Sequence, residues 1–170
     1  ISFLAPSEDV DRALTAGRIQ TMNIIVAMNN LLQQVIPNGV GRYTDEFYPT
    51  ATGDNFQKLG YNTVLIEAGH YPNDYEREMT RKYHFFALLQ GIYHIAMNDD
   101  YTSYKRYFDI PNNVKNFYDV VHRYPNQTKN CVAYQYEEKI IKNKLVFDLQ
   151  KVMEKQIKNP LSHNEIVFDS

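Results

Sequence analysis

A carboxylate at the end of an apolar run is the residue best suited to chemistry in this sequence. Val64, Leu65 and Ile66 lead directly into Glu67, and a glycine follows two residues later. A continuous apolar run is typical of a strand buried on both faces of a helix-covered sheet. Ligands of open α/β sheets bind beyond the carboxyl ends of the strands. Glu67 is therefore a candidate general base, and pairing with an arginine or capping of the next turn is the structural alternative.

A histidine three residues after Glu67 raises the question of a metal site. His70 and Glu67 have the Glu-x-x-His spacing that suits a helix, but Gly69 and Pro72 argue against a helix here. A local hydrogen bond is the interpretation that we prefer for His70. The other histidines are scattered and show no HExxH or Cys-His spacing; they are His84, His94, His122 and His163. The sequence therefore predicts no metal ligands in this chain.

The segment before Glu67 offers further candidates. Tyr43 and Tyr48 lie in this segment, and either phenol could donate a hydrogen bond to a developing oxyanion. The chain has 14 tyrosines, so packing is the alternative for each of them. Residues 53–56, Gly-Asp-Asn-Phe, are either a turn that shapes a pocket or simply a turn.

Strands and helices that would position these residues alternate along the first part of the chain. Residues 1–5 are β-prone, and a helix capped by Ser7 or Asp9 should follow, with an apolar stripe from Val10 to Val35. Residues 40–60 read as a long loop without secondary structure of its own. A strand over 62–69 and a helix from Asp74 to about residue 97 complete an α/β pattern.

The tail has a different character. Residues 101–108 read as an aromatic linker, and strands are expected at 116–123, 131–139 and 144–149. Lys142 and Asn143 suit a two-residue hairpin turn, and residues 166–168 suit a short edge strand. These segments predict a small antiparallel β appendage.

Composition excludes several classes of partner. The 18 basic and 20 acidic residues give a formal net charge of −2, which offers no attraction for nucleic acid or an anionic membrane. No apolar run approaches the roughly 20 residues of a membrane helix. The single cysteine, Cys131, cannot form an internal disulfide and fits a reducing compartment such as the cytoplasm.

Three segments together resemble the zinc carboxypeptidase family, in a bacterial branch of the Bacteroidetes type. They are residues 41–48 (GRYTDEFY), residues 52–56 (TGDNF) and residues 63–70 (TVLIEAGH), the last followed by DYERE at 74–78. The likeness covers about residues 1–97. It implies that 1–98 is the C-terminal part of a catalytic domain with a mixed sheet flanked by helices. Residues 99–170 would be a linker and a small β-rich extension.

The resemblance assigns roles to several residues. Glu67 matches the family's catalytic glutamate, and Tyr48 (reserve Tyr43) matches its mobile tyrosine. Thr52, Gly53 and Asp54 fall where the family lines its specificity pocket. In that family zinc lowers the pKa of water and polarises the peptide carbonyl while the glutamate relays the proton. The implied activity is removal of C-terminal residues from a peptide or related amide.

The chain departs from the family in lacking the His-x-x-Glu zinc ligands and the Asn-Arg pair that binds the substrate carboxylate. It also starts within an expected strand and without an initiator Met, so we expect a fragment of a longer zinc enzyme, inactive alone and with no cofactor of its own. A non-catalytic binding or scaffold module is the alternative. A half-sheet would expose an apolar edge, which predicts a homodimer.

Overall fold

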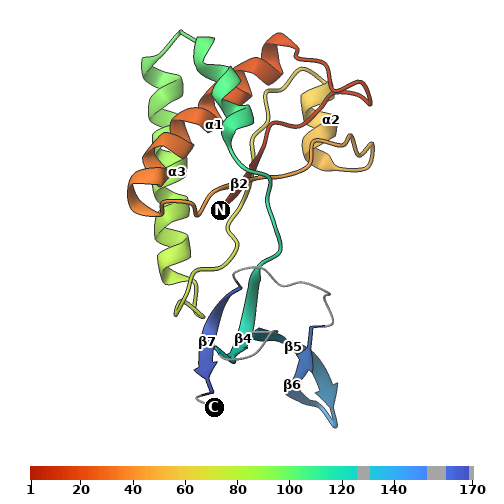
Figure 1. The fold of residues 1–170 in the computed structure, drawn as a ribbon. Helices are drawn as coiled ribbons and strands as arrows, with labels where there is room; N and C mark the ends of the chain where they lie inside the picture. Colours follow the sequence, from red (N-terminus) through yellow and green to blue (C-terminus); the bar gives the residue numbers. More distant parts are fainter. Residues whose placement is uncertain (126–130, 153–159, 169–170) are drawn as a thin grey trace. The chain divides into compact units, whose positions relative to one another are not determined.

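The computed structural model describes residues 1–125, 131–152 and 160–168, and these residues form a mixed α/β structure with four helices and two mixed sheets. Figure 1 shows the elements in chain order. They are β1 (Ser2–Leu4), α1 (Ala16–Val35), β2 (Gly41–Arg42), α2 (Thr52–Lys58), β3 (Leu65–Glu67), α3 (Glu78–Met97), the 3-10 helix η1 (Thr102–Asp109), β4 (Phe117–Arg123), β5 (Cys131–Ile141), β6 (Lys144–Lys151) and β7 (Leu161–Val167).

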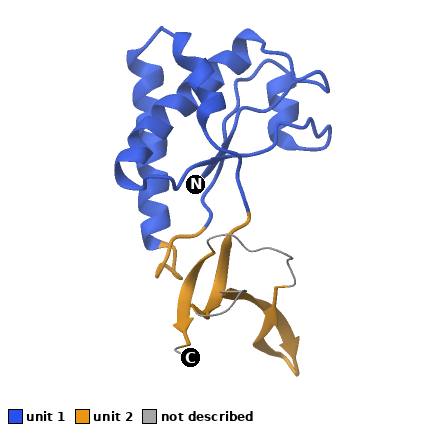
Figure 2. Cartoon of the chain, viewed as in Figure 1, with its two compact units in different colours: residues 1–69, 78–114 blue, residues 70–77, 115–170 orange. Residues whose placement is uncertain are grey.

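The chain forms two compact units, drawn in separate colours in Figure 2. Unit 1 contains residues 1–69 and 78–114, and unit 2 contains residues 70–77 and 115–170. These bounds differ from the segments 1–98 and 99–170, because residues 99–114 belong to unit 1 and residues 70–77 belong to unit 2. Whether either unit is a catalytic domain or an extension stays a prediction.

Unit 1 is built around a three-stranded sheet in the order β2-β1-β3. The expected strand at the start of the chain is confirmed as β1, which pairs in parallel with β2 and antiparallel with β3. Its Phe3 is fully buried. β3 pairs with β1 alone among the described strands, and its apolar residues are only partly buried. The expectation of a strand buried on both faces was wrong, because Leu65 and Ile66 are only partly buried; β3 also lies at an edge of the sheet.

The first long helix was correctly expected, but it begins later than Ser7 or Asp9. Thr15 caps α1 by accepting a hydrogen bond from the Arg18 amide at 3.3 Å, and Val10 is 78% exposed in the preceding segment. Residues 7–14 continue the apolar spacing but form no helix. The carbonyls of Arg12 and Ala13 in this segment accept hydrogen bonds from the Arg18 side chain instead. Further along, the stripe is buried as expected, at Met22, Ile25, Met28 and Leu32.

The second long helix also begins later than expected. α3 starts at Glu78, because Asn73 and Arg77 adopt positive φ angles of 57° and 60° that a right-handed helix cannot contain. α1 and α3 lie side by side (Figure 1), and α3 buries a narrow face. That face consists of Thr80, Tyr83, Ala87 and Gly91.

Two segments that were expected to be irregular contain helices. α2 lies within the expected loop at 40–60, and η1 replaces the expected aromatic linker at 101–108. η1 packs against α1 through Tyr107, which is fully buried. Its phenol accepts a hydrogen bond from the Ala5 amide at 3.2 Å, so η1 also secures the end of β1.

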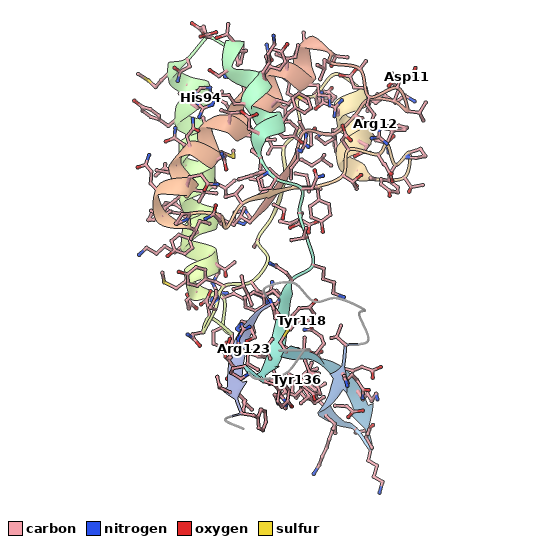
Figure 3. The ribbon with its side chains drawn as sticks, in the orientation of Figure 1. Asp11, Arg12, His94, Tyr118, Arg123 and Tyr136 are labelled. Atoms are coloured by element: carbon pink, nitrogen blue, oxygen red, sulfur yellow. The ribbon has the colours of Figure 1, made fainter. Side chains whose placement is uncertain are left out.

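Unit 2 is a four-stranded sheet in the order β6-β5-β4-β7. The hairpin turn at Lys142 and Asn143 is confirmed, with φ angles of 50° and 59° that fit a type I′ turn. β7 runs parallel to β4, so the sheet is mixed rather than antiparallel as expected. Arg123 on β4, labelled in Figure 3, bonds Glu165 on β7 at 2.7 Å and supports this parallel pair.

We expect Tyr107→Phe to destabilise unit 1 by about 1–3 kcal/mol, because the buried Ala5 amide would lose its acceptor. Tyr104→Phe removes a hydroxyl from the same helix at a partly exposed position and should change stability by less than about 0.5 kcal/mol. Urea unfolding followed by circular dichroism measures both. Equal stability of the two variants would contradict the role given to the Tyr107 hydroxyl.

Candidate functional site

Glu67 is the last residue of β3 and is exposed. The register pairs Glu67 with Ser2 and Leu65 with Leu4, so these side chains share one face of the sheet. Because β3 is antiparallel to β1, the carboxyl end of β3 lies beside the start of β1. The carboxylate is thus displayed at a sheet end, where a substrate could reach it.

Tyr43 is the candidate tyrosine that the structure brings to Glu67. It directly follows β2, and its amide donates a hydrogen bond to the Phe3 carbonyl at 2.9 Å. Its phenol lies close enough to the Glu67 carboxylate for the two groups to interact. Hydrogen bonding to Glu67, then partial burial and the negative charge of Glu67, raises the pKa of Tyr43 above its ordinary value of 10.0. The phenol therefore stays protonated and remains a hydrogen-bond donor near neutral pH.

Tyr48, the first choice from the sequence, has a different partner. Its phenol donates a hydrogen bond to the Glu46 carboxylate at 3.2 Å, and its side chain is exposed. Its backbone amide donates to the Asp54 carboxylate at 2.7 Å. The spacing of loop residues could not distinguish the two tyrosines, because only the β2–β1–β3 pairing decides which phenol reaches Glu67.

The candidate pocket residues Thr52, Gly53 and Asp54 form the first turn of α2, so the expected turn at 53–56 was wrong. Asp54 is buried, and its carboxylate accepts a hydrogen bond from the Tyr48 amide. This bond is a structural role for Asp54. The pocket role of these residues stays a prediction. A cavity of about 300 Å³ beside α1 and α3 is lined by other residues, among them Asn23, Asn30, Gln90 and His94.

A buried arginine that the sequence analysis did not single out holds the loop that carries both tyrosines. The Arg18 side chain is 1% exposed, and its Nη2 contacts the Asp45 carboxylate at 2.6 Å. The same guanidinium donates to the carbonyls of Ala5, Arg12 and Ala13 at 3.2, 2.6 and 3.4 Å. A signal existed in the sequence: Arg18 lies one helical turn before Met22, at the start of the buried stripe.

Asp45 receives a second arginine as well. Arg12, labelled in Figure 3 on the segment before α1, contacts the other carboxylate oxygen of Asp45 at 3.2 Å. Partial burial would raise the pKa of Asp45, but the hydrogen bond and charge of Arg18, with the charge of Arg12, hold it below its ordinary value of 3.8. The carboxylate is therefore ionised throughout the physiological range.

The described residues do not provide a metal centre. Within residues 1–125, 131–152 and 160–168, no group of three or more His, Cys, Asp or Glu side chains could hold a metal ion. His70 lies in unit 2, where its Nδ1 is 3.3 Å from Nε2 of His163 and its ring stacks on Phe117. The expected local hydrogen bond of His70 is seen with Arg77, at 3.4 Å.

Comparisons with known protein families, curated proteins and solved structures found no match. Among the described helices, none combines the length and apolar character that crossing a membrane requires.

The Tyr43–Glu67 hydrogen bond predicts a titration effect. Glu67→Gln removes the negative charge, so the pKa of Tyr43 should fall toward its ordinary value of 10.0. Glu46→Gln, which alters the partner of Tyr48, should leave the Tyr43 titration unchanged. NMR of tyrosine labelled at Cζ follows the titration, and an unchanged Tyr43 pKa in Glu67→Gln would contradict the contact.

The Arg18–Asp45 pair predicts an acid-dependent contribution to stability. The pKa of Asp45 is lowered by folding, so its contribution is present above pH 3.8 and is lost as pH falls through the lower folded value. Asp45→Asn should therefore destabilise at pH 7, and the difference in stability from the unmodified protein should close as pH falls through the lower folded pKa. Asp11→Asn, an exposed change in the neighbouring segment, is the matched control. Urea unfolding across pH 2.5–7 tests this, and a gap that persists at the lowest pH counts against it.

Proposed function

We propose that this chain supplies the catalytic base of a zinc-carboxypeptidase-like site that hydrolyses C-terminal peptide or related amide bonds. The observation that carries the proposal is the Glu67 carboxylate at the end of β3, joined by the Tyr43 phenol. The resemblance of residues 41–48, 52–56 and 63–70 to that family supports the same roles.

The two side chains have complementary chemistry. A water-accessible carboxylate can accept a proton from an attacking water and pass it to the leaving amine. A phenol that stays protonated can donate a hydrogen bond to negative charge as it develops on the carbonyl oxygen. Their proximity brings both polar groups together before a substrate arrives, which lowers the entropy lost in ordering them.

Zinc, when bound, supplies Lewis-acid activation in the family. The described residues of this chain do not fit the ion, since they form no group of three suitable ligands. The proposal therefore places the zinc ligands and the substrate-carboxylate pair in a longer protein, and it holds this chain to be inactive alone.

The edge position of β3 supports the proposal that this chain forms part of a larger carboxypeptidase-like sheet. Among the described strands, β3 has no partner beyond β1, whereas the outer side of β2 is met by residues 111–113. A free strand edge is a template for further pairing. It suits the C-terminal half of a larger carboxypeptidase-like mixed sheet, and in this chain alone it suits a homodimer.

The catalytic role is tested in the longer protein with a peptide substrate. Glu67→Gln should lower kcat by about 10²–10⁴-fold, because the general base is lost. Glu46→Gln is the matched control, since it makes the same change on an exposed carboxylate that hydrogen bonds Tyr48 instead. Release of the C-terminal residue, followed by mass spectrometry, is the readout.

The two tyrosines are separated in the same assay. Tyr43→Phe should lower kcat by about 10²–10³-fold, the loss expected for one oxyanion donor, and Tyr48→Phe should leave kcat nearly unchanged. Full turnover in Glu67→Gln would refute the role of the carboxylate. A longer protein that binds no zinc and cleaves no peptide would instead support a non-catalytic binding module.

A further inference from the structure

The segment that follows Glu67 after two intervening residues belongs to the second compact unit. Residues 70–77 group with residues 115–170, although residues 78–114 separate them in the sequence. The segment is short and has no strand or helix of its own. Within the segment, the Asp74 amide donates to the Tyr71 carbonyl and the Arg77 amide donates to the Asp74 carbonyl, at 3.2 and 3.0 Å. The segment also packs through aromatic rings against the strands of unit 2.

Four aromatic rings supply that packing, and we call His70, Tyr75, Phe117 and His163 the ring anchor. His70 stacks on Phe117 with centroids 5.1 Å apart and planes at 14°. The His163 ring meets Phe117, Tyr75 and His70 edge-on, at 4.9, 5.0 and 5.4 Å. Two of the rings come from the segment, one from β4 and one from β7. His163 is 8% exposed and touches the other three, so it is the centre of the anchor.

The donor and the acceptor of each hydrogen bond in the ring anchor can be assigned. An arginine can only donate, so the contact from Arg77 Nη2 at 3.4 Å makes Nε2 of His70 an acceptor. The proton of neutral His70 then lies on Nδ1, which donates to Nε2 of His163 at 3.3 Å. His163 must therefore carry its own proton on Nδ1, and this buried atom has no hydrogen-bond partner among the described residues. The arrangement requires both imidazoles to be neutral.

We propose that His163 anchors residues 70–77 to the β4–β7 pair, and that this anchor is a pH-sensitive device within unit 2. All of its contacts lie within that unit, so the anchor does not depend on the proposed function.

Acid should release the anchor. A second proton on His70, at Nε2, would point an N–H at the Arg77 guanidinium, which can only donate. Partial burial, then the electrostatic effects of Arg77 and His163, lower the pKa of His70 below 6.5, and the charge of Asp119 opposes them. The other titratable group in contact is Tyr75. Because folding lowers this pKa, the contribution of the anchor is present above pH 6.5 and is lost as pH falls through the lower folded value.

Amide hydrogen exchange of the 170-residue chain, followed by NMR and corrected for intrinsic rates, tests the anchor. The reporters are the turn amides of Asp74 and Arg77, and the strand amides of β4 report on the integrity of the sheet. His163→Ala should lower the protection of both reporters at least about tenfold at pH 7.5. His122→Ala is the matched control, because His122 lies in β4 but its ring meets Tyr134 and Phe168 instead.

A second variant guards against loss of the sheet. His70 lies outside the strands, so His70→Ala should release the reporters while the β4 amides stay protected. In the unmodified chain, protection of the reporters should fall between pH 7.5 and 5, and in His70→Ala it should not depend on pH. Unchanged protection in His70→Ala, an equal loss in His122→Ala, or pH-independent protection in the unmodified chain would each overturn the anchor. Because these measurements need no turnover, they remain decisive if the proposed enzymatic activity fails.

Discussion

The buried guanidinium of Arg18 is the interaction on which the first unit depends. A charge removed from water must be paired and fully hydrogen bonded, or it destabilises the fold by several kcal/mol. Asp45 and three backbone carbonyls meet this requirement, and each comes from a segment without regular structure. One side chain thus ties the end of β1, the open segment before α1 and the loop before α2 to the first turn of α1. A planar fork with five donors can do this, whereas a lysine could not.

The loop held by Arg18 and the strand that ends in Glu67 come together through the sheet. β1 lies between β2 and β3, so the phenol of Tyr43 reaches across one strand to the carboxylate. Tyr107 holds the other end of β1 through the Ala5 amide. The candidate site is therefore a product of long-range contacts, and a short sheet of two- and three-residue strands can support it because helices and buried polar groups immobilise its ends.

The second unit holds residues 70–77, a short segment that has no helix or strand of its own. Its core is small, centred on Tyr118, Val121 and Ala133. The β4–β7 pair adds aromatic side chains on which residues 70–77 pack. Ring stacking and neutral imidazole contacts suit this purpose, because they bury apolar area while satisfying all but one of the polar atoms of the histidine pair.

Several features followed from the sequence alone. The apolar spacing at Met22, Ile25, Met28 and Leu32 determined the buried face of α1, and the run before Glu67 determined a strand with a carboxylate at its end. Lys142 and Asn143 determined the hairpin, because few residue pairs tolerate two positive φ angles. These are local properties, set by side-chain periodicity and by backbone preference.

Long-range contacts decided the remaining features of the fold and the site, since they can override local preference. They decided that α1 begins at Ala16, after a segment whose carbonyls accept hydrogen bonds from Arg18, and that β3 lies at an edge of its sheet. They also decided that Tyr43 rather than Tyr48 meets Glu67, and that His70 pairs with a histidine 93 residues away.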